Sequence, residues 1–535
     1  MEATRKAVVI GTGAGGLAAA GFLARSGFDV TAVEQAPHLG GSLAPFERQG
    51  FTFDVGIHYV GQCRPGQLMS EQLAALGLDS SALFSELEPD GFDIYRFPDF
   101  EVRNCRGLDR FRDRLQALFP EEAAGLAEVF ETLTRVRELM ALGVRPHGGK
   151  LHASDLAALR AVPMLWRWRR GTWGDFLRHH LKDERARAAL SAMCGDWGLP
   201  PGRSAALVAL AIIADYSDGA FFPKGGGGAL LQALVDAAQG HGVTFRTHVA
   251  AQRILVSRGC VTGVELEDGE ALGADVVVSD VDPTVTLGHL VGPEHLPARL
   301  RAHVARTEPS LGMAVVYLGL RRDLRQHGMS AANLWSYPST DLDGQFEPLG
   351  RGELPPQLSL FLSSNSLKDT TGSLAPPGCS TLEVVTFVPE AMFERWAHLP
   401  AGARGEDYHA LKEQLADRML GEVEARFPGL VGDIAVREVA TPLTWLDSLR
   451  APHGGVYGPA MTPRQSGFYR FRTRTPVQGL FLAGQGVLSM GISPVLLSGR
   501  LAARAAEHYT EQRGRLRHHL GEGRTWHSEA KAPPF

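Results

Sequence analysis

Three glycines near the start of the chain and one acidic residue after them have the spacing of a dinucleotide-binding site. Gly11, Gly13 and Gly16 lie in the segment GTGAGG, and Glu34 follows Gly11 by 23 residues. In this pattern the first glycine permits a tight turn, the second lets a pyrophosphate approach the backbone, and the third lets a helix pack on a strand. The carboxylate accepts hydrogen bonds from ribose hydroxyls. The residues therefore predict dinucleotide binding, with a purely structural turn as the alternative.

Two further glycine-rich segments distinguish between dinucleotides. Gly40 and Gly41 lie in QAPHLGGSL, directly after Glu34, where they let the backbone approach a second stretch of an extended cofactor. The segment LFLAGQGVLSMG near the C-terminus combines a strand, glycines and a following helix, whose N-terminus suits an electron-rich ring edge. A nicotinamide-binding domain needs neither segment, so FAD is the predicted cofactor.

Residues that could act on a substrate carry a weaker signal. His58 in GIHYVG titrates near neutral pH and is the candidate acid or base, with a hydrogen-bonded structural histidine as the alternative. Tyr59, Tyr216, Phe221 and Phe222 are candidates to line the substrate site, and core packing is the alternative for each. The five cysteines contain no C-x-x-C pair, so the sequence predicts no metal site and no disulfide framework.

The dinucleotide motif lies within a βαβ pattern, in which strands at 7–10 and 30–33 flank a helix at 17–26. The rest of the chain alternates between similar patterns: helical periodicity at 108–137, α/β patterns at 230–279, strand-like runs around a helix at 311–469, and a strand, glycine turn and helix at 479–509. This order predicts an α/β fold, with a Rossmann-like FAD-binding domain assembled from separated segments and an interleaved α+β substrate domain.

The expected domain boundaries follow from the same alternation. The FAD-binding domain is expected at 1–105, 215–300 and 470–510, and the substrate-binding or cap domain at 106–214 and 301–469. Residues 511–535 are polar and are expected to form a C-terminal tail.

Composition excludes several classes of protein. The 535 residues contain 54 Lys and Arg against 59 Asp and Glu, a net charge of −5, which gives no bulk basic charge for binding nucleic acid. The N-terminus has no pattern of a signal peptide. The longest apolar run, at 205–214, has ten residues, whereas a membrane-spanning helix needs about 20. We therefore expect a cytoplasmic protein without a transmembrane segment.

One segment nevertheless suits a membrane surface. Residues 164–173 (MLWRWRRGTW) combine three Trp with three Arg, and both residue types anchor at lipid headgroups. The segment predicts peripheral membrane contact, with a solvated helix packed through its Trp side chains as the alternative. A lipophilic substrate would give such contact a purpose.

Longer motifs carry a resemblance to a known family. FDVGIHYVG (53–61), GDWGLPP (195–201), AIIADYSDGAFFPKGG (211–226) and GLFLAGQGV (479–487) are similar to the phytoene desaturase-like branch of FAD-dependent oxidoreductases. That branch includes carotenoid desaturases, carotenoid isomerases and retinol saturases (all-trans-retinol 13,14-reductases), and the resemblance is closest to the last group. The chain departs from that group at Gly486, because retinol saturases resemble AGQD where this chain has AGQG.

The resemblance implies which residues hold FAD, with Val249 meeting the adenine through its backbone. The implied cofactor-binding residues are Gly11, Gly13, Ala14, Gly15, Gly16, Glu34, Gln35, Gly40, Gly41, Ser42, Val249, Gly484, Gln485, Gly491 and Ile492.

The resemblance also implies an FAD-dependent oxidoreductase that acts on carbon–carbon double bonds of a hydrophobic polyene. Saturation, desaturation and cis–trans isomerisation stay open, and NAD(P)H or a quinone is the candidate external electron partner. A flavin-free lipid- or prenyl-binding escort protein and an amine oxidase are alternatives from other classes. The intact glycines and Glu34 argue against the escort, and no sequence signal indicates the aromatic cage that an amine oxidase needs.

Overall fold

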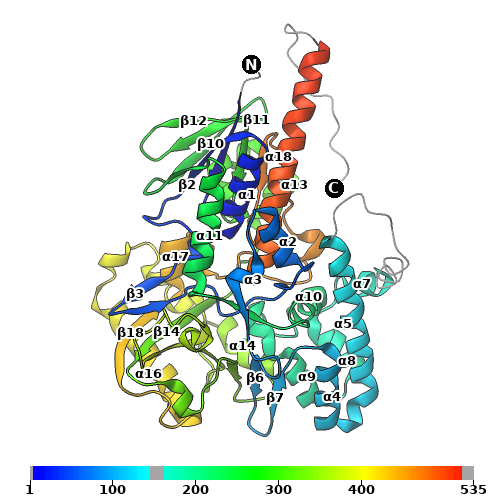
Figure 1. The fold of residues 1–535 in the computed structure, drawn as a ribbon, viewed down its shortest axis with the longest axis vertical. Coiled ribbons are helices and arrows are strands. Elements are labelled where there is room, and N and C mark those ends of the chain that lie inside the picture. Colours follow the sequence, from blue (N-terminus) through cyan, green and yellow to red (C-terminus); the bar gives the residue numbers. More distant parts are fainter. Residues whose placement is uncertain (1–3, 145–161, 521–535) are drawn as a thin grey trace.

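A computed structural model describes residues 4–144 and 162–520 of the chain. Figure 1 shows two lobes. The upper lobe contains the N-terminal strand, a parallel sheet and the long C-terminal helix, and the lower lobe contains a larger sheet with a group of helices beside it. The predicted α/β fold is confirmed.

The upper lobe is built around a parallel sheet whose strands come from distant parts of the sequence. In spatial order its strands are β19 (Leu480–Leu482), β13 (Val276–Ser279), β1 (Arg5–Ile10), β2 (Phe28–Val33) and β9 (Thr244–Arg246). Helices α1 (Ala14–Arg25), α11 (Gly226–Gly240) and α18 (Ile492–Leu520) cover one face, and the antiparallel sheet of β10 (Ala251–Ser257), β11 (Cys260–Leu266) and β12 (Ala271–Gly273) covers the other. β1 is apolar without alternation because Val9 packs on the helix side and Val8 on the opposite side.

The lower lobe is built around a seven-stranded sheet. Its strand order is β18 (Ile434–Ala440), β14 (Gly312–Leu320), β17 (Ser380–Val388), β16 (Leu360–Ser363), β15 (Asn333–Ser336), β6 (Asp93–Arg96) and β7 (Glu101–Asn104). α16 (Gly405–Arg426) packs on one face. The other face packs on α4 (Leu108–Leu118), α5 (Ala123–Val144), α8 (Trp173–His180), α9 (Glu184–Ser191) and α10 (Ala206–Asp215).

Short elements join the lobes and complete the fold. They are β3 (Phe46–Arg48), β4 (Phe51–Phe53), β5 (Phe84–Glu86), β8 (Phe221–Pro223), α2 (Leu68–Ala75), α3 (Ser80–Leu83), α7 (Val162–Trp168), α12 (Pro283–Val285), α13 (Ala298–Ala305), α14 (Leu342–Gly350), α15 (Asn365–Lys368) and α17 (Pro442–Leu449).

The structure differs from the expected boundaries at two places. β6 and β7 were expected in the FAD-binding part, but they extend the seven-stranded sheet because β6 pairs in parallel with β15, Asp93 lying opposite Asn333. The expected tail at 511–535 begins as helix, because α18 continues to Leu520.

Candidate functional site

One cavity of about 1110 Å³ extends from the glycine turn of the upper lobe to the seven-stranded sheet of the lower lobe. Its volume exceeds the roughly 300–1,000 Å³ of a typical small-molecule pocket. Residues from both lobes form its wall. Because of its volume, the cavity has room for an extended cofactor together with an apolar ligand.

The glycine turn after β1 forms one end of this cavity. Gly11 has a φ of +87°, which glycine adopts without strain, and it turns the chain into α1. Gly13 precedes α1, and the first turn of that helix has no side-chain cap and no acidic residue. Its backbone N–H groups and positive dipole end are therefore suited to an anion such as a pyrophosphate.

Glu34 follows β2 and lies on the cavity wall. Its Oε2 accepts hydrogen bonds from the backbone N–H (3.0 Å) and the hydroxyl (2.8 Å) of Thr12, and its Oε1 accepts one from the N–H of Ala36 (2.9 Å). These bonds fix the carboxylate at the carboxyl edge of the sheet. Each carboxylate oxygen accepts more than one bond, so Glu34 can also accept from a ribose hydroxyl.

The C-terminal glycine turn lies beside the first one, although 470 residues separate them in sequence, because β19 and β1 both flank β13. Gly484 has a φ of +87°, and its N–H donates to the hydroxyl of Ser498 at 2.8 Å. A Cβ built on Gly15 would lie 2.9 Å from the backbone nitrogen of Gly484. This close approach brings Gly484 and Gln485 to the cavity wall.

A buried carboxyl group lies between the two glycine turns. Asp280 follows β13, and a Cβ on Gly13 or Gly484 would lie 2.6 Å from one of its carboxyl oxygens. Burial raises the pKa of Asp280 to about 7, a hydrogen bond from the Gly16 backbone opposes that rise, and the charge of Glu34 adds to it. Its Oδ1 has no hydrogen-bond partner among the described residues. Because of this raised pKa, Asp280 is partly protonated near neutral pH, and a pyrophosphate bound here would meet less negative charge.

The structure brings most of the sequence-predicted residues together on this cavity. Those on its wall are Gly11, Gly13, Ala14, Glu34, Gln35, Gly40, Gly41, Ser42, His58, Tyr59, Tyr216, Gly484, Gln485, Gly491 and Ile492. Gly15 and Gly16 lie behind the wall, where the close approaches of the turn leave no space for a side chain. The backbone N–H of Val249 donates to the carbonyl of Glu34 at 3.1 Å, so Val249 supports the wall from behind.

Phe221 and Phe222 are not part of the wall. Phe221 lies opposite Glu86 in the two-stranded antiparallel sheet of β5 and β8, and Phe222 is fully buried in a cluster with Tyr59 and Phe92. Packing therefore keeps both rings outside the cavity, in the core position that the sequence left as the alternative.

The far end of the cavity is largely apolar. Side chains from α5, α10, β14, β17 and α17 line it: Met140, Ile212, Met313, Val315, Tyr317, Val385, Trp445 and Leu449. Tyr59 and Tyr216 also lie on the wall, and their rings stack on each other with centroids 4.4 Å apart and an interplanar angle of 19°. A long hydrocarbon is the class of ligand that such a wall accommodates.

His58 reaches the cavity from the loop after β4, and its side chain is 24% exposed. Its Nδ1 lies 2.9 Å from Oε2 of Glu383, a residue of β17 whose side chain is completely buried. The two groups are within ion-pair distance but are not aligned for a hydrogen bond, and the Glu383 carboxylate accepts no bond from the described residues. One ring nitrogen of His58 therefore lies against a buried carboxyl group of the seven-stranded sheet.

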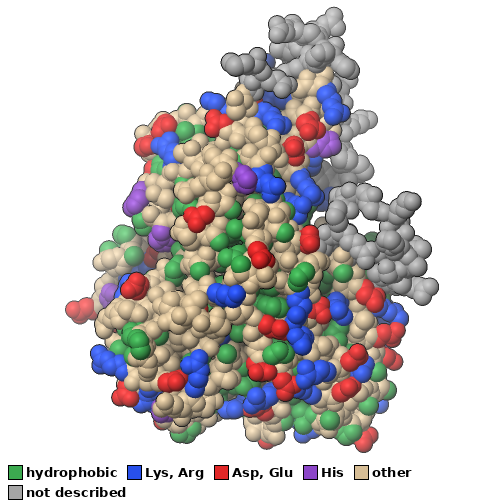
Figure 2. Space-filling model, in the orientation of Figure 1, with side chains coloured by type: hydrophobic (Ala, Val, Ile, Leu, Met, Phe, Trp, Pro, Cys, Tyr) green, Lys and Arg blue, Asp and Glu red, His purple; other side chains and the backbone are tan. Residues whose placement is uncertain are grey.

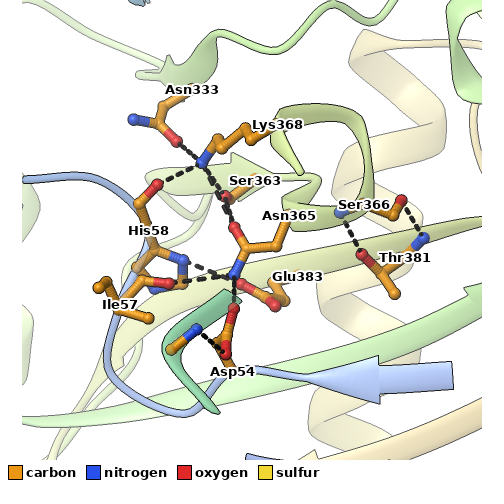
Figure 3. A network of polar contacts seen from close by, with 11 residues as sticks. Asp54, Ile57, His58, Asn333, Ser363, Asn365, Ser366, Lys368, Thr381 and Glu383 are labelled. Atoms are coloured by element: carbon orange, nitrogen blue, oxygen red, sulfur yellow. Dashed lines mark hydrogen bonds and ion pairs between the residues drawn. The ribbon is translucent and has the colours of Figure 1, made fainter. Parts of the chain in front are cut away.

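A polar network behind His58 joins the two lobes (Figure 3). The buried ammonium of Lys368 donates to the carbonyl of His58 (2.7 Å), to the hydroxyl of Ser363 (2.6 Å) and to the amide oxygen of Asn333. The Asn365 amide nitrogen donates to the carboxylate of Asp54 at 3.1 Å. This arrangement fixes the loop that carries His58 to the seven-stranded sheet.

Buried charges in this network shift each other's titration. Burial lowers the pKa of Lys368 to about 7, although the charges of Glu383, Asp93 and Asp54 oppose that shift. Burial raises the pKa of Asp54 to about 7 and that of Asp93 to about 6. Asp93 accepts hydrogen bonds from the Asn333 amide (3.0 Å) and the Trp335 indole (3.3 Å).

Sequence reasoning did not single out Asp196, Asp280, Glu383 or Lys368. Asp196 lies in GDWGLPP and Asp280 at the end of an apolar strand, so position in a motif was an available signal for these two. Glu383 and Lys368 carry no such signal, because only the pairing of distant strands places them behind His58.

The Trp- and Arg-rich segment at 164–173 is exposed only in part. Trp173 is completely buried and stacks on Phe176, whereas Trp166 is 57% exposed. The centroid of the Trp166 ring lies 6.3 Å from that of Phe468, a residue that is 69% exposed. The Arg169 guanidinium lies 4.0 Å from the centroid of the Trp166 ring. We call Trp166, Phe468, Arg167, Arg169 and Arg170 the aromatic–arginine patch.

Other surface features set this patch in context. On the face shown in Figure 2, basic and acidic side chains are interspersed rather than gathered by sign. Within 4–144 and 162–520, no helix combines the length and the apolar character needed to cross a bilayer.

Comparison with known proteins identifies relatives along most of the chain. Residues 14–506 match the model of the family described as flavin containing amine oxidoreductase. All-trans-retinol 13,14-reductase of Danio rerio is 27% identical, covering 92% of this chain and 84% of the relative. The zeta-carotene-forming phytoene desaturase of Myxococcus xanthus is 28% identical, covering 93% of each chain.

Solved structures show the same fold. Cyclohexylamine oxidase from Brevibacterium oxydans superposes with a TM-score of 0.59 at 17% identity, covering 95% of this chain and all of that one.

Proposed function

The chain belongs to the flavin containing amine oxidoreductase family, and from this premise we propose that it is an FAD-dependent oxidoreductase of carbon–carbon double bonds in a hydrophobic, retinoid- or carotenoid-like polyene. One observation carries the proposal: a single cavity contains both the glycine turns suited to a dinucleotide and an apolar wall suited to a long hydrocarbon. The similarity to a retinol reductase and to a phytoene desaturase supports this choice of substrate class.

The residues around the glycine turns fit FAD. The uncapped start of α1 and Gly13 accept the pyrophosphate, Glu34 accepts the ribose hydroxyls, and the turn at Gly484 approaches from the opposite strand. Bound FAD supplies the hydride-transfer chemistry, as donor or acceptor. The protein's own contribution is to hold the polyene in an apolar, water-excluding space and to manage the proton that accompanies the hydride.

Tyr59 and Tyr216 do not form the aromatic cage that an amine substrate needs. A cage for a nitrogen needs two rings that face each other across an open gap. Tyr59 and Tyr216 instead lie in direct stacking contact, with 4.4 Å between centroids, which leaves no space between them for a ligand group. A polyene that lies along the apolar wall needs no such gap.

The direct test is anaerobic. We expect that, when retinol or an acyclic carotene in detergent is added to the protein with reduced flavin, the absorption band of oxidised flavin returns and the polyene absorbs at shorter wavelength. This result would establish net saturation.

The other outcomes separate the alternatives. Reduced flavin with a changed isomer composition of the polyene would indicate an isomerase, and reaction only with oxidised flavin would indicate a desaturase. A purified protein that is colourless and binds no FAD would contradict the proposal and favour an escort protein.

We further propose that NAD(P)H or a quinol supplies the electrons from outside the chain. When NADH, NADPH or a reduced quinone is added to the oxidised protein in the absence of oxygen, one of the three should bleach the flavin band. If all three left the band unchanged, a separate reductase protein would be required.

We propose in addition that the aromatic–arginine patch docks on anionic membranes, from which a lipophilic substrate would be taken. Indole and guanidinium groups both favour the headgroup region, and each basic residue near an anionic surface contributes about 1 kcal/mol. Replacing Arg167, Arg169 and Arg170 together by Glu should therefore reduce flotation with anionic liposomes at least about ten-fold.

A matched control is available on and directly after α13, where Arg299, Arg301 and Arg306 have exposed side chains and form no ion pairs within the described chain. Their replacement by Glu changes the net charge equally and should leave flotation near that of the wild type. Equal flotation of the patch variant and the wild type would refute docking through this patch.

A further inference from the structure

Asp196 is a half-buried acid on the cavity wall. It ends the 3₁₀ helix at Ala192–Asp196, within the segment GDWGLPP. Its Oδ2 accepts a hydrogen bond of 2.6 Å from the hydroxyl of Tyr59, and its Oδ1 accepts none from the described residues. One carboxyl oxygen is therefore held by the protein, and the other is available to carry a proton.

The surroundings of Asp196 favour its neutral form. Burial raises its pKa to about 8, the negative charges of Asp93 and Asp215 add to the rise, and the hydrogen bond from Tyr59 opposes it. The pKa of Tyr59 is raised well above its ordinary value by burial and by Asp196. At neutral pH Tyr59 is thus a phenol that donates its hydrogen bond, and Asp196 is the group that holds a transferable proton.

His58 is less suited to donate a proton to the substrate. Its ring lies 2.9 Å from the buried carboxylate of Glu383, which accepts no hydrogen bond from the described residues. The Nδ1 atom of His58 is itself buried against that carboxyl group, so this side of the ring does not face a ligand in the cavity. Asp196 differs from His58, because its Oδ2 already accepts a hydrogen bond from Tyr59 that stabilises the ionised product.

We propose that Asp196 is the proton donor when the double bond of the substrate is saturated, and that Tyr59 positions its carboxyl group. The inference rests on the proposed function. The O–H bond of Asp196 breaks and a C–H bond forms at one carbon of the double bond, while the other carbon receives the hydride, with its electron pair, from the reduced cofactor. The Asp196 carboxylate then regains a proton from water.

The first test needs no substrate. Infrared difference spectra of the FAD-loaded protein, recorded as pH is raised, should show a carboxylic acid C=O band that fades around pH 8 and is missing in Asp196→Asn. Asp215→Asn is the matched control, since it removes another carboxyl group on the same wall. It should keep the Asp196 band, which should fade at a somewhat lower pH because the charge of Asp215 no longer raises the pKa of Asp196. A band that persists unchanged in Asp196→Asn would overturn the inference.

The second test follows the polyene. Removing a general acid typically costs about 10²- to 10⁴-fold in rate, and Asp196→Asn should lose this much of its saturation rate while it keeps FAD and still binds retinol. His58→Gln should lose less, because His58 is not the donor. An unchanged rate in Asp196→Asn would overturn the inference, and so would a loss confined to His58→Gln.

A positioning role for Tyr59 has its own signature. The Tyr59 hydrogen bond favours the carboxylate, so its removal in Tyr59→Phe raises the pKa of Asp196 further. The alkaline limb of the pH–rate profile should therefore move upward by up to about one pH unit. A limb that moved downward would contradict this role.

Failure of the two proposals can be told apart. A wild type that saturates no polyene would refute the proposed function. A wild type that saturates a polyene, but whose Asp196→Asn variant does so at the same rate, would refute the assignment of Asp196 alone.

Discussion

Gly13→Ala should give a folded protein that has lost most of its FAD. The backbone of Gly13, with φ −61° and ψ 177°, suits any residue, and an added Cβ would meet only the carboxyl group of Asp280, at 2.6 Å. That side chain can rotate, so the fold tolerates the methyl group. The methyl group would nevertheless project where the pyrophosphate approaches the backbone. We expect FAD affinity to fall roughly ten-fold or more, about 1.4 kcal/mol.

Gly21→Ala is the matched control on the same helix. Its Cβ would lie 3.1 Å from a methyl group of Leu76, away from the cavity, and that side chain can shift. Flavin absorbance per protein, circular dichroism and the melting temperature should be measured for both variants. A Gly13→Ala protein with the wild-type flavin content would contradict the assignment of this turn to the pyrophosphate.

The predictable part of the fold is the part encoded in local patterns. Predicted strands at 7–10 and 30–33, the helix between them and the strand in GLFLAGQG are all present as β1, β2, α1 and β19. Local periodicity could identify these elements but could not give the strand order, because β13 lies between β1 and β19 through contacts across hundreds of residues.

The same limit applies to the site. Residues of the glycine turns could be named because the backbone geometry of a dinucleotide site demands glycine at set spacings. Lys368, Glu383 and Asp93 could not, since they meet His58 only after β6 pairs with β15 and β16 pairs with β17. Phe221 and Phe222 show the reverse error: proximity in sequence to a glycine-rich turn suggested the cavity wall, but the β5–β8 hairpin turns them into the core.

The electrostatics behind His58 lead to the largest expected effect on stability. Lys368→Met would remove the buried ammonium that donates hydrogen bonds to His58, Asn333 and Ser363, and would leave Asp54 and Asp93 without the cation that opposes their negative charge. Removing one partner from a buried charge network typically costs about 3–5 kcal/mol. At pH 7, close to the pKa of both Lys368 and Asp54, we therefore expect the free energy of unfolding to fall by up to about that amount.

The loss should be smaller at pH 5. When the pKa of a carboxyl group is higher in the folded than in the unfolded protein, the fold loses stability as pH rises through the folded-state pKa. The pKa values of Asp54 and Asp93 are raised to about 7 and about 6. At pH 5 both are protonated and need no cation. Lys368, with a pKa lowered to about 7, is charged at pH 5 and costs the wild type stability there. Both effects bring the variant closer to the wild type in acid.

Urea unfolding of both proteins with saturating FAD, at pH 5 and pH 7, measures this difference. Lys224→Met, which removes a surface ammonium that donates to the carbonyl of Ser81, should change stability by less than about 0.5 kcal/mol. Adding Asp54→Asn to Lys368→Met should restore part of the loss at pH 7, because it removes one of the uncompensated carboxylates. If Lys368→Met were as stable as the wild type at pH 7, the network would not depend on its cation, and the fixed position of the His58 loop would need another cause.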